Sequence, residues 1–124
     1  MINIDKVWPE YTGKGISIRI NDLGIDPNND DFEGRFDEAN SCDNYLPFQN
    51  NDGTLDPHGT RVAGVIVGNA NNNFCAAGIA YDATFTSCNV AVTNNFSNYL
   101  SLRAHLPSKT ENFELSNNLI FCFS

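Results

Sequence analysis

The chain has 124 residues, of which 41% are hydrophobic and nine are phenylalanines, so it suits a single domain with a modest core. Fifteen acidic and seven basic residues give a net charge of −8, which argues against a nucleic-acid partner because a phosphate backbone requires a basic face. This charge suits a cationic partner or a divalent metal, but it is also common on ordinary soluble domains. No apolar run approaches the roughly 20 residues that span a bilayer, and the mixed, charged start of the chain does not resemble a signal peptide.

The first predicted element is a β-strand. The stretch GKGISIRIND, residues 13–22, alternates three isoleucines with polar residues after a glycine turn, which is the period of a strand. Gly24 and Pro27 then predict a tight reversal and a loop. Residues 37–57 are rich in Asn, Asp, Gly and Pro, and we expect them to form a long surface excursion.

A helix is expected next, with Asp56 as its N-cap and Pro57 at the first helical position, where a missing N–H costs nothing. The stretch IAYDATFTSCNVA, residues 79–91, is expected to carry a second strand. Strand, loop, helix and strand in this order predict a parallel sheet. Further along, the pattern favours a short helix over 94–106 and one more strand within 115–124.

Two reactive groups are expected at one edge of this sheet. In open α/β sheets such groups lie just beyond the carboxyl ends of the strands, and Asp22 follows the first strand directly. If the helix that begins near His58 packs over this strand end, Asp22 accepts a hydrogen bond from the imidazole, fixes its tautomer and stabilises the imidazolium. Taken singly, such an Asp is more often a turn residue and a lone His more often structural. The combination favours two thirds of a nucleophilic triad.

Three motifs carry a family resemblance. INDLGID (20–26) and HGTRVAG (58–64) resemble the aspartate and histidine motifs of subtilisin-like serine proteases, the subtilases, and AAGIAYDATF (76–85) resembles a segment that follows them. Order and spacing agree over about residues 6–92, and the motifs are most similar to those of the kexin and furin branch, the proprotein convertases. The resemblance implies an α/β fold with a doubly wound parallel sheet, of which residues 1–124 would form an incomplete, N-terminal half.

The resemblance also implies a serine endopeptidase that acts on polypeptides, with Asp22 as the triad aspartate and His58 as the general base. The family's nucleophile lies in a Gly-Thr-Ser-x-Ala motif, and residues 93–124 match the family poorly, as divergent or truncated sequence would. No serine of the chain stands in such a motif; serine occupies positions 17, 41, 87, 97, 101, 108, 116 and 124. We therefore expect a fragment without its nucleophile. The alternative is a non-catalytic, truncated module that binds calcium or a protein partner.

A structural calcium ion is expected by resemblance near the loop after the first strand. Asp31 would supply a carboxylate, Asn72 a side-chain oxygen, and Asn69, Phe74 and Ala76 their backbone carbonyls. An oxygen-only set of this kind suits Ca²⁺. The alternative is that this stretch is asparagine-rich like the rest of the chain and that Asp31 is merely solvated.

Specificity is the point at which the chain departs from the family. Convertases select basic residues with acidic side chains around the substrate groove, and one of these normally follows the catalytic aspartate. Leu23 occupies that position here and cannot pair with Lys or Arg. The sequence therefore does not support a dibasic preference.

The four cysteines leave both two disulfides and four thiols open, because Cys42, Cys75, Cys88 and Cys122 are too widely spaced for a CxxC pair. By resemblance, Cys75 stands where convertases carry a cysteine bonded to a distant partner, which would lie outside this chain. The resemblance implies the secretory pathway or the extracellular space, and the sequon at Asn95 supports secretion only weakly. The compartment stays open.

Overall fold

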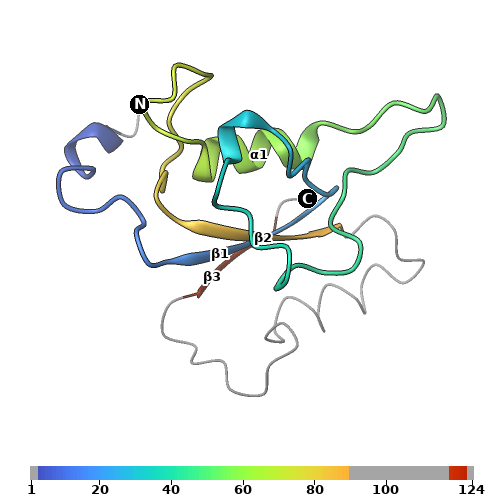
Figure 1. The fold of residues 1–124 in the computed structure, drawn as a ribbon, viewed down its shortest axis with the longest axis horizontal. Helices are drawn as coiled ribbons and strands as arrows, with labels where there is room; N and C mark the ends of the chain where they lie inside the picture. The colour runs from blue at the N-terminus through green and yellow to red at the C-terminus, as the bar shows by residue number, and fades with distance from the viewer. Residues whose placement is uncertain (1–2, 90–117, 123–124) are drawn as a thin grey trace.

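The computed structural model of the chain describes residues 3–89 and 118–122 (Figure 1). Within them, one α-helix and three β-strands are joined by loops and two short 3-10 helices. In chain order the elements are η1 (Ile4–Lys6), β1 (Ser17–Asp22), η2 (Asp30–Phe32), α1 (His58–Val67), β2 (Thr84–Asn89) and β3 (Asn118–Cys122). No helix in this part of the chain is long and apolar enough to cross a bilayer.

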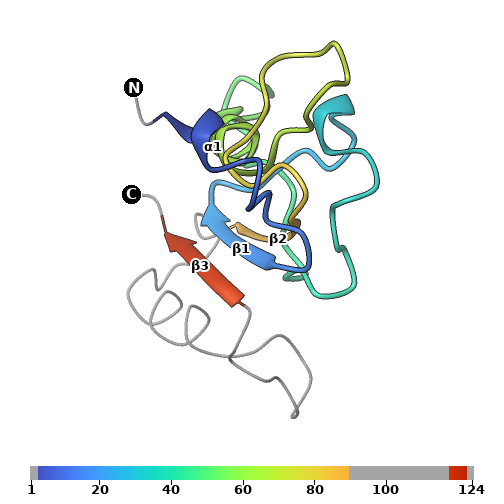
Figure 2. The ribbon, with the colours of Figure 1, turned by 90° about the vertical axis from the view of Figure 1, so that its left-hand side faces the viewer.

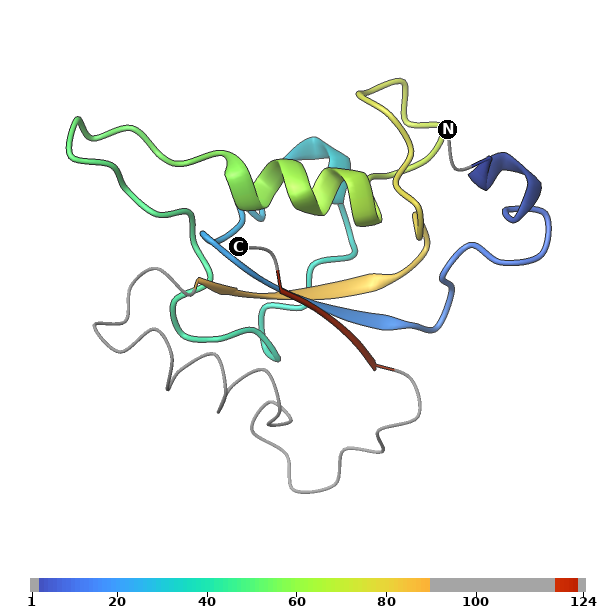
Figure 3. The ribbon, with the colours of Figure 1, turned by 180° about the vertical axis from the view of Figure 1, so that it is seen from behind.

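The strands form a parallel sheet in the order β2-β1-β3, with β1 at its centre. The second and third strands that the sequence predicts are present as β2 and β3, although each is shorter than the stretch that predicts it. Helix α1 connects β1 to β2 and lies on one face of the sheet (Figures 2 and 3). The described residues therefore form part of an α/β fold. The doubly wound extension of the sheet stays a prediction, and the helix expected over 94–106 lies outside the described residues.

The core lies between α1 and the sheet. Ile18 and Ile20 point from β1 into this layer, as their alternation with Ser17 and Arg19 predicts. From α1, Ala63 and Val67 are fully buried four positions apart, which places both on the helix face toward the sheet. Two aromatic rings complete the layer: Phe32 and Phe85 meet edge to face with ring centroids 5.1 Å apart.

Helix α1 begins one residue later than the sequence predicts. Pro57 is the N-cap, with φ −83° and ψ 0°, and the first helical residue is His58. Asp56 nevertheless does the capping, because its Oδ1 accepts a hydrogen bond of 2.8 Å from the His58 N–H. The prediction of Asp56 as N-cap and Pro57 as first helical residue is thus wrong by one position. The carboxylate bridges over Pro57, which has no N–H to bond.

The 37–57 segment is less of a surface excursion than its composition suggests. A disulfide joins Cys42 to Cys88 of β2, with the two Cα atoms 5.0 Å apart, and both cysteines are buried. The Cys42 N–H also donates to the carbonyl of Ser87, so the segment is held to β2 by both covalent and hydrogen bonds. Cys75 is a free, exposed thiol.

We expect the Cys42–Cys88 disulfide to carry a large share of the stability. It closes a loop with a sequence separation of 46, and the chain-entropy model gives about 4 kcal/mol for a loop of this length. Replacing both cysteines by serine should lower the free energy of unfolding in urea by about 2–4 kcal/mol. The matched control is Cys75→Ser, which removes an exposed thiol and should leave stability within about 0.5 kcal/mol. Equal stability of the double variant and the wild type would contradict the assignment.

Candidate active site

The site is built around Asp22, the last residue of β1. Its side chain is 1% exposed, and its Oδ1 accepts a 2.6 Å hydrogen bond from the N–H of Leu23, the next residue. The register of the sheet sets Asp22 beside Asn89 at the end of β2. The carboxylate is therefore fixed by the backbone at the carboxyl edge of the sheet, as the sequence predicts.

His58 lies across from this carboxylate at the first position of α1. Its Nδ1 is 2.6 Å from Asp22 Oδ1, while 53% of its side chain is exposed. Since a carboxylate can only accept, Nδ1 carries the proton in this contact and Nε2 is the basic nitrogen of the neutral ring. The structure thus brings together the two residues that the sequence singles out, with one nitrogen committed to Asp22 and the other left basic.

Two glycines allow other segments of the chain to approach the turn after β1 closely. Gly59 lies so near the backbone of Gly24 that a Cβ at position 59 would clash with the Gly24 carbonyl and would stand 3.2 Å from Asp22 Oδ1. Gly24 itself has φ +85°, which favours glycine, and a Cβ there would clash with the carbonyl of Leu46. Gly59 thus lets the start of α1 approach the turn after β1, where His58 meets Asp22, while Gly24 lets the backbone of Leu46 approach the same turn.

Electrostatics favour a charged imidazole. The hydrogen bond that His58 donates to Asp22 raises the pKa of His58 above its ordinary value of 6.5, and the charge of Asp22 acts in the same direction. Asp56 adds to this effect, whereas partial desolvation and the charge of Arg61 oppose it. The second oxygen of Asp22, Oδ2, is buried and has no hydrogen-bond partner among the described residues. Its carboxylate is therefore compensated through Oδ1 alone, by the Leu23 N–H and the His58 ring.

A second cluster contains the residues expected to hold calcium. Asp31 is buried in η2, and its Oδ1 accepts a 2.9 Å hydrogen bond from Asn72 Nδ2. The carbonyl of Asp31 accepts from the N–H of Asn69 at 2.9 Å. Asn72 Oδ1 in turn accepts from the N–H of Phe74 at 3.1 Å. The structure therefore brings Asp31, Asn69, Asn72 and Phe74 into one hydrogen-bonded network.

The carbonyl oxygen of Ala76 lies near this network, beside Gly68. A Cβ built on Gly68 would lie 2.6 Å from the Gly64 carbonyl oxygen, 2.7 Å from Asp31 Oδ2 and 2.9 Å from the Ala76 carbonyl oxygen, so Asp31 Oδ2 and the Ala76 carbonyl approach the same point beside the end of α1. Among the described residues no three His, Cys, Asp or Glu side chains gather as a metal site, so a cation here would depend on one carboxylate with amide and carbonyl oxygens. That donor set fits a hard cation such as Ca²⁺.

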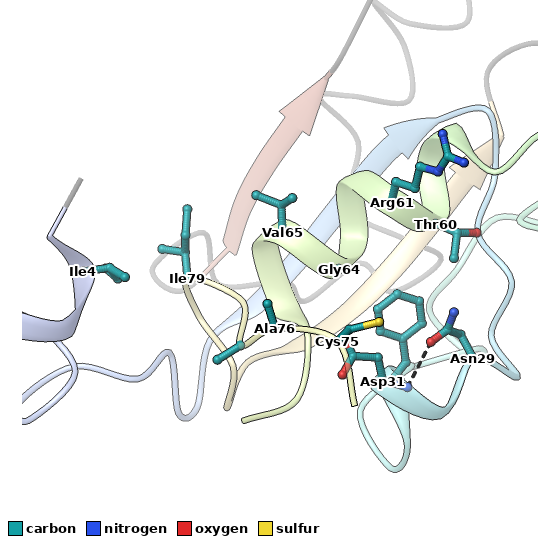
Figure 4. A pocket seen from close by; sticks show the side chains of 12 residues that line it. Ile4, Asn29, Asp31, Thr60, Arg61, Gly64, Val65, Cys75, Ala76 and Ile79 are labelled. Atoms are coloured by element: carbon teal, nitrogen blue, oxygen red, sulfur yellow. Dashed lines mark hydrogen bonds between the residues drawn. The ribbon is translucent and has the colours of Figure 1, made fainter. Parts of the chain in front are cut away.

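Two features of this region are not predicted by the sequence. Arg35 donates from Nε to Asn69 Oδ1 at 2.6 Å and from its guanidinium to the Asp31 carbonyl at 3.2 Å, which places a fixed cation beside the cluster. A cavity of about 480 Å³ also opens next to Asp31 (Figure 4). Cys75 and Ala76 line it, but neither member of the Asp22–His58 pair does. No local pattern in the sequence predicts either feature, because the Arg35–Asn69 bond and the cavity both bring together residues more than 30 positions apart.

Comparison with known proteins places these residues in a family. The model of the subtilase family, Peptidase_S8, matches residues 13–120. Similar proteins include proprotein convertase subtilisin/kexin type 5 of Branchiostoma californiense (37% identical over 95 residues), furin of Bos taurus (37% over 94) and proprotein convertase subtilisin/kexin type 6 of Homo sapiens (38% over 88). These alignments cover 66–67% of this chain but only 5%, 11% and 9% of the respective relatives. The expected resemblance to the kexin and furin branch is confirmed.

We expect the pKa of His58 to lie above 6.5 and to return toward that value in the Asp22→Asn variant, because the amide removes both the charge and the ionic hydrogen bond. The measurement is an NMR pH titration of the imidazole, with the second histidine signal assigned through His105→Gln. Since protonation is favoured in the folded state, the stability that it adds is complete below about pH 6.5 and is lost as the pH rises through the folded pKa. An unshifted His58 titration in the wild type would contradict the 2.6 Å contact.

Proposed function

The chain belongs to the subtilase family, whose members are serine peptidases, and from this premise we propose that it carries the aspartate and histidine of a serine endopeptidase. The observation that carries the proposal is the 2.6 Å contact between His58 Nδ1 and the buried Asp22 Oδ1. In this geometry the histidine is oriented by one nitrogen and leaves the other for chemistry. The substrate class is polypeptide, as the family implies.

In the proposed mechanism His58 Nε2 accepts the proton of a serine hydroxyl as the hydroxyl oxygen attacks the scissile carbonyl. Asp22 keeps the ring in the tautomer with the proton on Nδ1 and stabilises the imidazolium that forms. His58 then gives its proton to the leaving amine, and the same cycle with water as the nucleophile releases the acyl group. The 53% exposure of the His58 side chain supports this role, because the ring must reach a bound peptide.

The nucleophile is proposed to come from sequence beyond these 124 residues. Among the described residues, no serine hydroxyl hydrogen-bonds to the His58 ring. Ser41 and Ser87 are buried, and their hydroxyls bond to the backbone of the 37–45 segment and of β2. Ser17 begins β1, at the end opposite Asp22. The remaining serines stand in no motif that resembles the family's nucleophile.

We further propose that the Asp31 cluster binds calcium for stability. Asp31, Asn72 and the backbone carbonyls of Asn69, Phe74 and Ala76 would hold the ion, with the Asn72 amide turned so that its oxygen faces it. The convergence of Asp31 Oδ2 and the Ala76 carbonyl on one point supports this assignment. When bound, the ion would neutralise the buried Asp31 carboxylate and tie the 69–76 loop to η2.

An oxidising compartment is proposed for the mature protein. The buried Cys42–Cys88 disulfide supports it, since such bonds form and persist in secreted and extracellular proteins. This agrees with the secretory pathway or extracellular space that the family resemblance implies. It does not distinguish between the two.

The proposed triad can be tested with a fluorophosphonate, which labels an activated serine. We expect no labelling of the 124-residue chain, and labelling of the protein translated from the complete natural transcript. In that longer protein, Asp22→Asn should lower kcat by about 10⁴-fold at neutral pH, because the histidine loses its productive tautomer. Glu10→Gln, a surface carboxylate far from the site in sequence, is the matched control. A transcript that encodes no reactive serine would favour the alternative, a non-catalytic module that binds calcium or a protein partner.

The calcium site predicts a melting temperature that depends on calcium. At a hundredfold excess of the ion over its Kd, binding to the folded state alone adds about 2.7 kcal/mol of stability. A chelator should remove this gain, and Asp31→Ala should abolish the response. Asp30→Ala is the matched control, because Asp30 is the adjacent carboxylate but is exposed. A melting temperature unaffected by calcium in the wild type would contradict the site.

A further inference from the structure

Arg35 is fixed beside the Asp31 cluster by all three nitrogens of its side chain. Nε donates to Asn69 Oδ1 at 2.6 Å, and one terminal nitrogen donates to the Asp31 carbonyl at 3.2 Å. The other terminal nitrogen donates to the carbonyl of Ala83 at 3.1 Å. Because a guanidinium stays protonated in proteins, these bonds hold a permanent positive charge at this point of the fold.

Two of the three acceptors belong to residues that we propose as calcium ligands, Asp31 and Asn69. The Asn69 N–H also donates to the Asp31 carbonyl at 2.9 Å, so Arg35, Asn69 and Asp31 close a ring of hydrogen bonds. None of these bonds uses the Asp31 carboxylate, whose Oδ1 accepts from Asn72 and whose Oδ2 lies near the Ala76 carbonyl beside α1. Arg35 therefore leaves the carboxylate available to an ion but places a positive charge near it.

The charge of the cluster is small for a calcium site. Of the five proposed ligands only Asp31 carries a charge, since Asn72 offers an amide oxygen and the other three offer backbone carbonyls. Arg35 cancels the single negative charge, so the group is formally neutral before an ion binds. The affinity of a site for Ca²⁺ depends on the number of charged ligands and on the rigidity of the site. The hydrogen-bonded ring makes this site rigid, but its charge favours weak binding.

The charges of Arg35 and Asp31 act on one another. Burial lowers the pKa of Arg35, and the charges of Asp31 and Asp82 oppose this effect. Asp82 is exposed, so solvent and salt screen its charge, whereas Asp31 is buried and is screened much less. Arg35 thus stabilises the carboxylate of the ion-free cluster, and a cation that enters the cluster is repelled by the same guanidinium.

We propose that Arg35 sets the calcium affinity of the Asp31 cluster by charge repulsion, and that it holds the Kd near the 10⁻⁴–10⁻³ M of extracellular calcium modules, to about a factor of ten. This inference rests on the calcium site of the proposed function. In the ion-free state Arg35 compensates Asp31, and the ring of hydrogen bonds keeps the cluster in shape. The ion would then add its stability to the 69–76 loop only where calcium is abundant.

The test is a calorimetric titration of the chain with calcium, in the wild type and in two variants of Arg35. Arg35→Gln removes the charge, and we expect it to bind calcium about tenfold more tightly than the wild type. Arg35→Lys keeps the charge but loses the planar fork of donors, and its Kd should stay within about twofold of the wild-type value. Lys14→Gln is the matched control, because it makes the same change in net charge at an exposed residue and should leave the Kd unchanged.

Terbium(III) separates charge from geometry, because it takes oxygen ligands as calcium does but carries one more charge. A Coulomb energy is proportional to the charge of the ion, so a tenfold gain for Ca²⁺ in Arg35→Gln predicts a gain of about thirtyfold for Tb³⁺. A change in the shape of the site would alter both affinities by a similar factor. Circular dichroism in a chelator verifies that each variant folds, and Arg35→Met, which also lacks the charge, replaces the glutamine variant if that one does not.

Equal or weaker calcium binding by Arg35→Gln would overturn the role of Arg35 and leave the calcium site standing. An equal gain in Arg35→Lys would also overturn it, because the charge would then not be the cause. The calcium site fails separately. If neither ion binds the wild type or Arg35→Gln saturably, or if Asp31→Ala leaves the binding unchanged, the site itself is wrong and the inference about Arg35 fails with it.

Discussion

The close approach of two backbones, at Gly24 and Gly59, is the constraint on which the rest of the site depends. A side chain at position 59 would meet the Gly24 carbonyl and displace α1 from the end of β1. The 2.6 Å bond between Asp22 and His58 would then lengthen, because His58 is the first residue of the displaced helix. The close approach at Gly24 and Gly59 sets the position of the helix. The Asp22–His58 bond that it permits then sets the imidazole tautomer and raises the pKa of His58.

The same contact explains why one carboxylate can remain buried. Asp22 has one oxygen without a hydrogen-bond partner among the described residues, so its charge is compensated by the His58 ring and one backbone N–H. A buried carboxylate with so few partners is costly unless a positive charge faces it. The contact with His58 therefore stabilises the end of β1, most strongly when the imidazole is protonated. The residue that we propose as a general base thus also has a structural role.

Much of the site could be predicted from the sequence because its signals are local. The alternation of isoleucines before Asp22 and the position of His58 at the start of a helix are read from short stretches, and general rules of α/β sheets bring the two together. Helix α1 starts one residue later than predicted because Asp56 accepts from the His58 N–H across Pro57, a geometry that residue preferences do not distinguish.

The Cys42–Cys88 disulfide and the Arg35 contacts could not be predicted in the same way. The disulfide and the Arg35–Asn69 bond each join residues more than 30 positions apart, and the disulfide depends on how the 37–57 segment folds back over β2. Composition alone describes that segment as polar and turn-rich, which is true of most of it but not of Ser41 and Cys42, which are buried. The residues that the family resemblance supplied for calcium do come together, although a bond between them does not by itself bind an ion.

The turn at residues 50–54 differs from the segments that flank it because it makes only local hydrogen bonds. Its hydrogen bonds are local: Asn50 and Thr54 bond to one another through their backbones, Thr54 bonds to Asp52, and the Gly53 carbonyl accepts from the side chain of the neighbouring Gln49. The flanking residues are fixed at Leu23 on one side and at His58 on the other, so the length of the connection is free to vary only in this turn. Additional residues, a fluorophore or an affinity tag could therefore be inserted there without moving the contact between Asp22 and His58.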